Sequence, residues 1–454
     1  PEVIDCDRLA VIPGMVNGHC HSNENWFRGR WDNLPLEPWM LFSYPAVGGP
    51  AQSPREIYVR TLIGALEMIH SGATSVVDFV YEQGGFSYDS LGAVVQAYRD
   101  LGLRALVAVG MSDRAFHETV VLEEDLVPAD LLAALTDQRP PAWPVWEQFA
   151  RGAVERYHRP EEGISIGLAP SGPQRCTDEF LQACAALADE LDLQVHIHVL
   201  ETRMQALSGR RMYGTTLPDH MREIGFLSPR VSFAHGIWLT PSDIETVADA
   251  GCSVVHNPVS NMKLGSGVCP VPHLLSHGVN VALGTDGMAS NDGNDMFGVL
   301  KAGGLLHKLW DLDYERWVGA REAWQMATAG GARALGEPSG LGRLEPGRRA
   351  DLVLLNLDSR VFTPMSRPLN SIVFGSTTTA VHASMVGGRW VMRDGAATGV
   401  DEPAILAEVR SLAPGILDRH DPAWAESERL LASVRAGWLA ARRADLGVTR
   451  TVPA

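Results

Sequence analysis

The sequence predicts an α/β fold: a (β/α)8, TIM-like barrel, a small β-sandwich domain built from both chain ends, and a helical C-terminal tail. Eight short apolar runs alternate with stretches of helical spacing, and the pattern changes after residue 340. Several of the runs end in histidine or are followed by an acidic residue. Alternating short strands and helices are typical of βα units with a parallel sheet. Eight such units match a closed barrel, which carries its chemistry at the carboxyl ends of the strands.

The barrel is predicted over residues 11–340. Its strands are expected at 16–20, 75–79, 104–109, 164–168, 194–199, 231–235, 253–256 and 279–283. Helical spacing between them is clearest at 55–70, 178–191, 241–250 and 271–277. Residues 111–150 are rich in proline and tryptophan and only weakly periodic. A segment of this length is either a lid or specificity loop, or a surface excursion with one short helix.

Both chain ends are expected to lie outside the barrel. Residues 347–356 and 380–394 have the pattern of short antiparallel strands with glycine turns, and residues 1–10 resemble a further strand. We therefore predict a small β-domain from 1–10 plus 341–400. The remaining 401–454 are rich in alanine, arginine and leucine and are expected to form a helical extension.

Composition excludes several classes of function. The chain has 454 residues, 45% hydrophobic and 20% charged, with a formal net charge of −16. Such an acidic surface repels phosphate backbones, so we expect no nucleic-acid partner. No apolar stretch approaches the ~20 residues of a membrane span, and no leader pattern is present. The six cysteines are scattered without a C-x-x-C pair, which favours reduced thiols in the cytoplasm. A homodimer is expected as the commonest closed assembly.

A metal site is predicted from four side chains at strand ends. His19 and His21 are two residues apart on one strand and point the same way. His198 and Asp286 complete a plausible set, and His196 is a rival because it shares a strand face with His198. Imidazoles with one carboxylate suit one divalent ion, Zn(II) first and Fe(II) as the alternative, with a position left for water. Taken singly, each histidine could be an ordinary core residue, and Asp286 could be a turn or helix cap.

Other hydrolytic and nucleotide-binding motifs do not occur. The sequence has no H-E-x-x-H and no G-x-x-x-x-G-K, and its one G-x-S-x-G string, at 163–167, overlaps the fourth expected strand instead of lying at a strand-to-helix turn. Protease, serine-esterase and nucleoside-triphosphate functions therefore lack support.

Four motif regions resemble the amidohydrolase superfamily, in particular its mononuclear aminohydrolase branch: 13–21, 196–202 with Ala234-His235, 256–267 and 284–292. Cytosine, guanine, 8-oxoguanine and S-adenosylhomocysteine deaminases and s-triazine hydrolases look like this. The resemblance implies that His198, three residues before Glu201, is the ligand rather than His196. It also implies catalytic roles for Glu201, His235 and Asp286. Members of the family carry a longer N-terminal segment, so either the sequence is truncated there or its β-domain is reduced.

The residues agree with a mononuclear site. Binuclear members use a carbamylated lysine on the fourth strand, and 164–170 contains no lysine. Glu201 comes where its strand ends, so its carboxyl group can stand beside the metal and move protons between water, a ring nitrogen and a leaving amine. We therefore expect a metal-dependent deaminase that releases ammonia from a small nitrogen heterocycle of the aminopurine, aminopyrimidine, pterin or s-triazine type. Water and that heterocycle are the expected partners.

The substrate is less sharply defined. Nucleoside deaminases of this family place a ribose-binding glutamate and a histidine in stretches that correspond to 44–49 and 170–174, and neither residue occurs there. Residues 212–221 resemble triazine hydrolases and 8-oxoguanine deaminases, so we expect a free heterocycle. Alternatives are displacement of chloride, alkylthio or alkylamine from a triazine-like ring, or opening of a cyclic amide. An imidazolone-type or guanidino-compound hydrolase, with Arg175 or an acidic lid residue contacting the substrate, and a non-catalytic metal-binding barrel are further alternatives.

Four side chains are candidates for substrate contact. Trp26 and Trp238 could stack on a planar ring, although packing at the barrel mouth is the simpler interpretation. Ser171 and Gln174 follow the fourth strand, where they could read the ring edge or simply form a turn.

Overall fold

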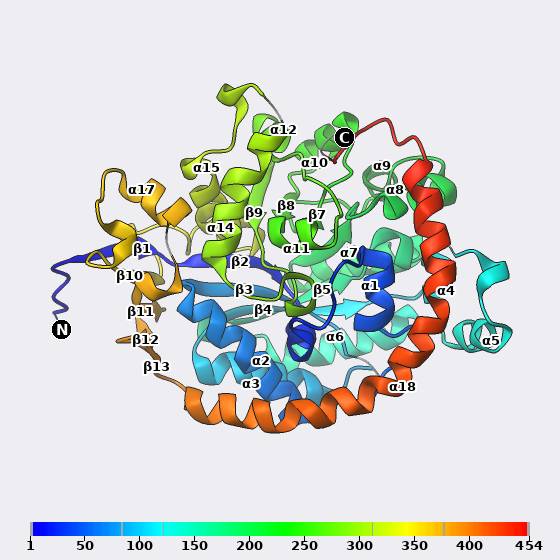
Figure 1. The fold of residues 1–454 in the computed structure, drawn as a ribbon, viewed down its shortest axis with the longest axis horizontal. Coiled ribbons are helices and arrows are strands. Elements are labelled where there is room, and N and C mark those ends of the chain that lie inside the picture. Colours follow the sequence, from blue (N-terminus) through cyan, green and yellow to red (C-terminus); the bar gives the residue numbers. More distant parts are fainter. Residues whose placement is uncertain (1–2, 83–84, 121, 311, 376, 452–454) are drawn as a thin grey trace.

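The structure is a computed structural model that describes residues 3–82, 85–120, 122–310, 312–375 and 377–451. It contains an eight-stranded parallel sheet and a five-stranded antiparallel sheet (Figure 1). The parallel strands, in order of pairing, are β2 (Met15–Cys20), β3 (Ala73–Val80), β4 (Arg104–Met111), β5 (Ile164–Pro170), β6 (Val195–Val199), β7 (Val231–His235), β8 (Ser253–His256) and β9 (Asn280–Leu283). Each predicted strand is found, and the TIM-like barrel is confirmed.

Helices surround the barrel (Figure 1). They are α1 (Leu36–Ser43), α2 (Pro54–His70), α3 (Tyr88–Leu101), α4 (Phe116–Thr119), α5 (Ala129–Asp137), α6 (Trp143–Tyr157), α7 (Asp178–Leu191), α8 (Arg203–Tyr213), α9 (Leu217–Glu223), α10 (Pro241–Asp249), α11 (Pro258–Lys263), α12 (Val271–Ser276), α13 (Met288–Asn291), α14 (Met296–Leu305), α15 (Ala320–Gln325), α16 (Gly331–Ala334), α17 (Pro368–Asn370) and α18 (Glu402–Arg443). Local sequence explains several starts: Ser53 and Glu56 form a capping box at α2, and Thr177 caps α7.

The barrel closes where β9 meets β2. A Cβ atom on Gly18 would stand 3.0 Å from the carbonyl oxygen of Leu283 and 3.0 Å from Cγ1 of Val255. Only glycine leaves room for this approach. The contact matters because His19 directly follows Gly18 and Asp286 lies just beyond β9. Closure therefore brings two predicted metal ligands, distant in sequence, to the same rim.

The antiparallel sheet joins both ends of the chain. Its order is β1 (Leu9–Pro13), β10 (Leu352–Asn356), β11 (Val381–Val386), β12 (Arg389–Arg393) and β13 (Ala396–Ala397). β1 pairs with β10 in a register that sets Leu9 opposite Asn356. In the described part of the chain, the strands expected to form a sandwich lie in this single sheet, and β1 extends to Pro13, beyond the predicted boundary at residue 10.

The C-terminal tail is a long helix followed by an extended return. α18 runs along one side of the barrel and up a second (Figure 1). The indole of Trp424 donates to the carbonyl of Phe42 in α1 at 3.0 Å. Beyond the helix the chain returns to the barrel, where Arg450 is buried. Over the described residues, no helix is both long enough and apolar enough to cross a bilayer.

Candidate active site

The four predicted metal ligands meet at the carboxyl end of the barrel. His19 and His21 lie at the end of β2, His198 lies in β6, and Asp286 follows β9. The Nε2 atoms of His19 and His21 are each 3.4 Å from Oδ1 of Asp286. The Nε2 atoms of His198 and His21 are 3.2 Å apart. Two ligand atoms ~2.0–2.1 Å from a tetrahedral zinc ion stand about 3.4 Å apart, so these separations fit one ion.

The imidazoles are oriented by their other nitrogens. Nδ1 of His21 lies 2.8 Å from the carbonyl oxygen of Phe79, and Nδ1 of His198 lies 3.0 Å from that of Ser171. A carbonyl can only accept, so Nδ1 carries the proton and Nε2 stays free as a ligand. Such partners on the far ring nitrogen are typical of metal-bound histidine. The buried Nε2 of His19 has no hydrogen-bond partner in the described chain, which is the open valence that a metal would fill.

His196 supports this cluster instead of competing for the ion. Its Nε2 lies 2.7 Å from Nδ1 of His19, and its Nδ1 lies 2.7 Å from Oγ of Ser232. Both ring nitrogens are therefore engaged by protein. This geometry favours His198 as the third imidazole ligand, in line with the expectation from sequence.

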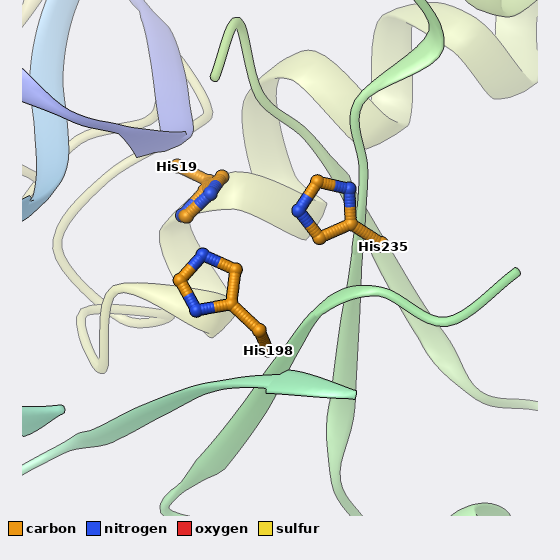
Figure 2. Close-up of side chains that lie close together, drawn as sticks. All are labelled: His19, His198 and His235. Carbon is orange, nitrogen blue, oxygen red and sulfur yellow. The ribbon is translucent and has the colours of Figure 1, made fainter. Parts of the chain in front are cut away.

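The two remaining predicted catalytic residues stand beside the cluster. Nε2 of His235 is 3.6 Å from Oε2 of Glu201 and 3.9 Å from Oδ2 of Asp286. Nδ1 of His235 donates to Oδ1 of Asn261 at 2.9 Å, which leaves Nε2 as an acceptor facing the site. Figure 2 shows the rings of His19, His198 and His235 pointing toward one another. The potential ligand atoms of these three histidines lie within 4.8 Å of one another.

Unusual backbone conformations place two of these side chains. His235 has φ +73° and Asp286 has φ +63°, and Leu200, just before Glu201, has φ +53°. Non-glycine residues rarely adopt this left-handed region, although histidine and aspartate do so more often than most, and it occurs in turns as well as at functional sites. The sharp turns at the strand ends direct the His235 and Asp286 side chains into the barrel mouth.

Burial sets the protonation states. It raises the pKa of Glu201 well above the ordinary carboxyl value, and the negative charge of Asp286 raises it further. Burial lowers the pKa of His19 to about 4 and also lowers the pKa of His235. The neutral form of the His19 and His235 imidazoles is therefore favoured, as metal ligation and proton acceptance require. The same burial favours the protonated form of Glu201.

A cavity of about 740 Å³ opens above this cluster. The 111–150 segment forms part of its wall through Phe116 of α4, Leu135 of α5 and Trp146 of α6. This placement favours a specificity segment over a simple surface excursion. Arg175, which the sequence offers as a substrate contact for one alternative function, lines the cavity, and so do side chains that the sequence analysis did not single out: Glu24, Tyr44, Tyr81, Glu82 and Arg114. Glu24 comes three residues after His21, and this short distance from a predicted ligand is the signal that could have identified it from the sequence.

The candidate substrate contacts divide into two groups. Ser171 lines the cavity, whereas Trp26, Gln174 and Trp238 are not among its lining residues. The indole of Trp26 donates to Gln52 at 3.0 Å, and that of Trp238 donates to the Ser266 carbonyl at 2.9 Å. Contact of Trp26, Gln174 and Trp238 with substrate stays a prediction, and the lining of the cavity does not support it. Both rings have packing and hydrogen-bonding roles at the barrel mouth.

Comparisons with known proteins match most of the chain. The model of the Amidohydrolase family matches residues 10–391. A 5'-deoxyadenosine deaminase of Methanothermobacter thermautotrophicus is 36% identical over 405 residues, 89% of this chain and 87% of its own. A 5-methylthioadenosine/S-adenosylhomocysteine deaminase of Nitratidesulfovibrio vulgaris is 34% identical over 417 residues, 92% of this chain and 87% of its own.

Solved structures resemble the chain over similar lengths. An adenosine deaminase from Xanthomonas campestris with bound zinc has a TM-score of 0.78 at 28% identity, covering 90% of this chain and 87% of its own. An atrazine chlorohydrolase from Arthrobacter aurescens TC1, complexed with zinc, has a TM-score of 0.82 at 27% identity, covering 90% of this chain and 89% of its own.

Proposed function

This chain belongs to the amidohydrolase family, and from that premise we propose that it is a metal-dependent deaminase of a purine-type heterocycle. The reaction replaces the exocyclic amino group with oxygen from water and releases ammonia. One observation carries the proposal: Glu201 and His235 stand 3.6 Å apart beside four converging metal ligands. A purely structural metal site has no need of an acid and a base at its edge.

The residues have distinct roles in the proposed mechanism. His19, His21, His198 and Asp286 would hold one divalent ion, which lowers the pKa of a water molecule from ~16 towards ~7. Nε2 of His235, left as an acceptor by the bond to Asn261, takes a proton from the attacking water. Asp286 helps to orient that water. Glu201, protonated because of its raised pKa, protonates the ring nitrogen next to the carbon under attack, and a second proton transfer lets ammonia leave.

Zinc is the proposed metal. Three imidazoles and a carboxylate suit zinc and iron alike. Zinc is present in the solved adenosine deaminase and atrazine chlorohydrolase that this chain resembles. Fe(II) is the alternative, and elemental analysis of the purified protein decides between them.

An aminopurine is the proposed substrate class. The curated relatives are, by their names, deaminases of adenine nucleosides, which moves the proposal from an unspecified heterocycle towards adenine derivatives. Residues 44–49 contain no glutamate, and residues 170–174 contain no histidine. These are the residue types that the family resemblance associates with ribose binding at those places. We therefore propose that the substrate carries an adenine-type ring and that its substituent is held by residues other than such a glutamate and histidine.

A second candidate is hydrolytic displacement of chloride from a triazine. Its support is the TM-score of 0.82 with an atrazine chlorohydrolase. Both reactions can use the same metal site, so the products must decide. Adenosine, 5'-deoxyadenosine, guanine, pterin and atrazine are offered to the zinc-loaded enzyme, with ammonia and chloride measured in parallel. Ammonia from an aminopurine supports deamination, whereas chloride alone supports the second candidate.

The Glu201→Gln variant tests the mechanism. We expect turnover to fall ~100- to 10,000-fold, the usual contribution of general acid–base catalysis, while the metal content stays that of the wild type. Near-normal turnover would remove Glu201 from the mechanism. Loss of the metal would assign it a structural role instead.

A cytoplasmic homodimer is part of the same proposal. The six cysteines are all free, which suits a reducing compartment. Two-fold dimers are the commonest closed assembly of soluble proteins. Light scattering of the purified chain tests the dimer, and a monomer at micromolar concentration would contradict it.

A further inference from the structure

Two arginines that line the cavity form no ion pair with a carboxylate among the described residues. Arg114 follows β4, and Arg175 ends the 3-10 turn η4 (Pro173–Arg175) after β5. Both line the cavity together with His198 and Glu201. The backbone N–H of Arg114 donates to the carbonyl of Arg175 at 3.2 Å, so the two loops are joined beside the cavity that both residues line.

The contacts of these guanidinium groups are weak. Nη2 of Arg175 lies 3.5 Å from Sδ of Met40, and its Cζ lies 5.9 Å from the centre of the Phe116 ring. Nη1 of Arg114 lies 3.9 Å from Sδ of Met212. A guanidinium group has five N–H donors, and a thioether sulfur is only a weak acceptor. Most of the hydrogen-bonding capacity of both groups therefore remains for a ligand.

Two other arginines at or near the cavity do have carboxylate partners. Arg139, which also lines the cavity, has Oε1 of Glu118 at 3.9 Å. Arg60 forms a buried ion pair with Glu82, another lining residue. The chain carries 54 acidic against 38 basic residues, so a surplus of carboxylates exists. Partly buried charges without partners are unfavourable, and burial lowers the pKa of Arg175. An anionic group of a bound substrate would relieve this cost.

We propose that Arg175 and Arg114 form a subsite for a carboxylate on the substrate, away from the carbon that is deaminated. The inference rests on the proposed deaminase function and narrows it to aminoheterocycles with an acidic substituent. A planar guanidinium group can donate two parallel hydrogen bonds to the oxygens of a carboxylate. The subsite also gives a role to the stretch after β5, where the family's nucleoside deaminases are expected to carry a histidine.

Matched substrate pairs test the subsite. One pair is adenosine and adenosine-5'-carboxylate, and the other is pterin and pterin-6-carboxylate. The zinc-loaded enzyme is tested for ammonia release with each, and for binding by calorimetry. We expect tighter binding of the carboxylate in at least one pair. Arg175→Met should reduce that preference by about 10- to 100-fold, the range for hydrogen bonds to a charged group, with little effect on the neutral probe.

Two further variants serve as controls. Arg139→Met removes a cavity-lining charge that already has a partner, and it should keep the carboxylate preference. Arg175→Lys keeps the charge but loses the planar fork, and it should restore part of the preference. The inference is overturned if the wild type binds both members of each pair equally, or if Arg175→Met weakens both members equally.

The two proposals fail in different ways. Carboxylate binding that depends on Arg175, without ammonia from any probe, would overturn the deaminase proposal and support the subsite. Ammonia release without a carboxylate preference would support the deaminase and overturn the subsite.

Discussion

Nε2 of His196 lies 2.7 Å from Nδ1 of His19, and both rings are buried. Since Nε2 of His19 must be free to bind a metal, its Nδ1 carries the proton and donates to His196. The second nitrogen of His196 then donates to Oγ of Ser232, 2.7 Å away. This series of hydrogen bonds, which comes from the barrel interior, fixes the tautomer of His19, a proposed metal ligand.

His196→Leu removes the acceptor from this chain and leaves the Nδ1–H of His19 buried without a partner. We expect metal affinity to fall about 10- to 100-fold, as is usual when such a partner is lost. Competition with a chelator measures it. His70→Leu, which removes a histidine paired with Glu402 on the helix surface, is the matched control and should bind metal like the wild type. Equal affinities in both variants would show that His196 only fills space.

The pH dependence of turnover should respond to Arg175. Deamination requires protonated Glu201, so kcat/KM falls as pH rises through the pKa of Glu201. The positive charge of Arg175 lowers that pKa, against the larger effect of burial, which raises it. Arg175→Met should therefore move the alkaline limb of the kcat/KM profile, measured on a neutral substrate, to higher pH. A shift to lower pH would contradict the assignment of this limb to Glu201.

Arg450 should stabilise the loop that follows His235. Its Nε donates to the carbonyl of Ile237 at 2.9 Å, and its Nη2 donates to that of Leu239. Arg450→Met leaves these buried carbonyls without donors, which costs about 1–3 kcal/mol in free energy of unfolding. Urea denaturation measures the change. The exposed Arg442, replaced by methionine in the same way, should give a value close to the wild type, and an equal loss in both variants would refute the idea.

Gly284→Ala should disturb the metal site without touching a ligand. The added Cβ would stand 2.9 Å from Cβ of His19 and 2.4 Å from Oδ1 of Asn257. We expect loss of bound metal as His19 is displaced. Gly415→Ala in α18, where nothing lies within 4 Å of the added atom, should keep the metal. Full metal occupancy in Gly284→Ala would mean that the barrel rim adjusts more easily than its packing indicates.

The barrel and its ligand cluster could be predicted because both follow from local patterns. His19 and His21 share a strand face by alternation, and Glu201 follows a strand end, where barrels place chemistry. His198 could not be separated from His196 by alternation alone. The structure favours it through the contact between His196 and His19, which are 177 residues apart in sequence.

Features that depend on distant contacts were not predictable. The sequence offered Arg175 only as a substrate contact for one alternative function, and the approach of Met40 and Phe116 is what reveals that its guanidinium forms no ion pair with a carboxylate in the described chain. Arg450 belongs to a tail of weak pattern, and its role depends on carbonyls more than two hundred residues earlier. Trp238 is of a residue type that often stacks on planar rings, yet its indole N–H donates to the carbonyl of Ser266.

Anomalous diffraction from crystals of the purified protein, collected on both sides of the zinc absorption edge, tests the central claim most directly. The account predicts one peak per chain, within ~2.0–2.2 Å of Nε2 of His19, His21 and His198 and of an oxygen of Asp286. Two peaks in the barrel mouth, or a single peak bound by other residues, would contradict it.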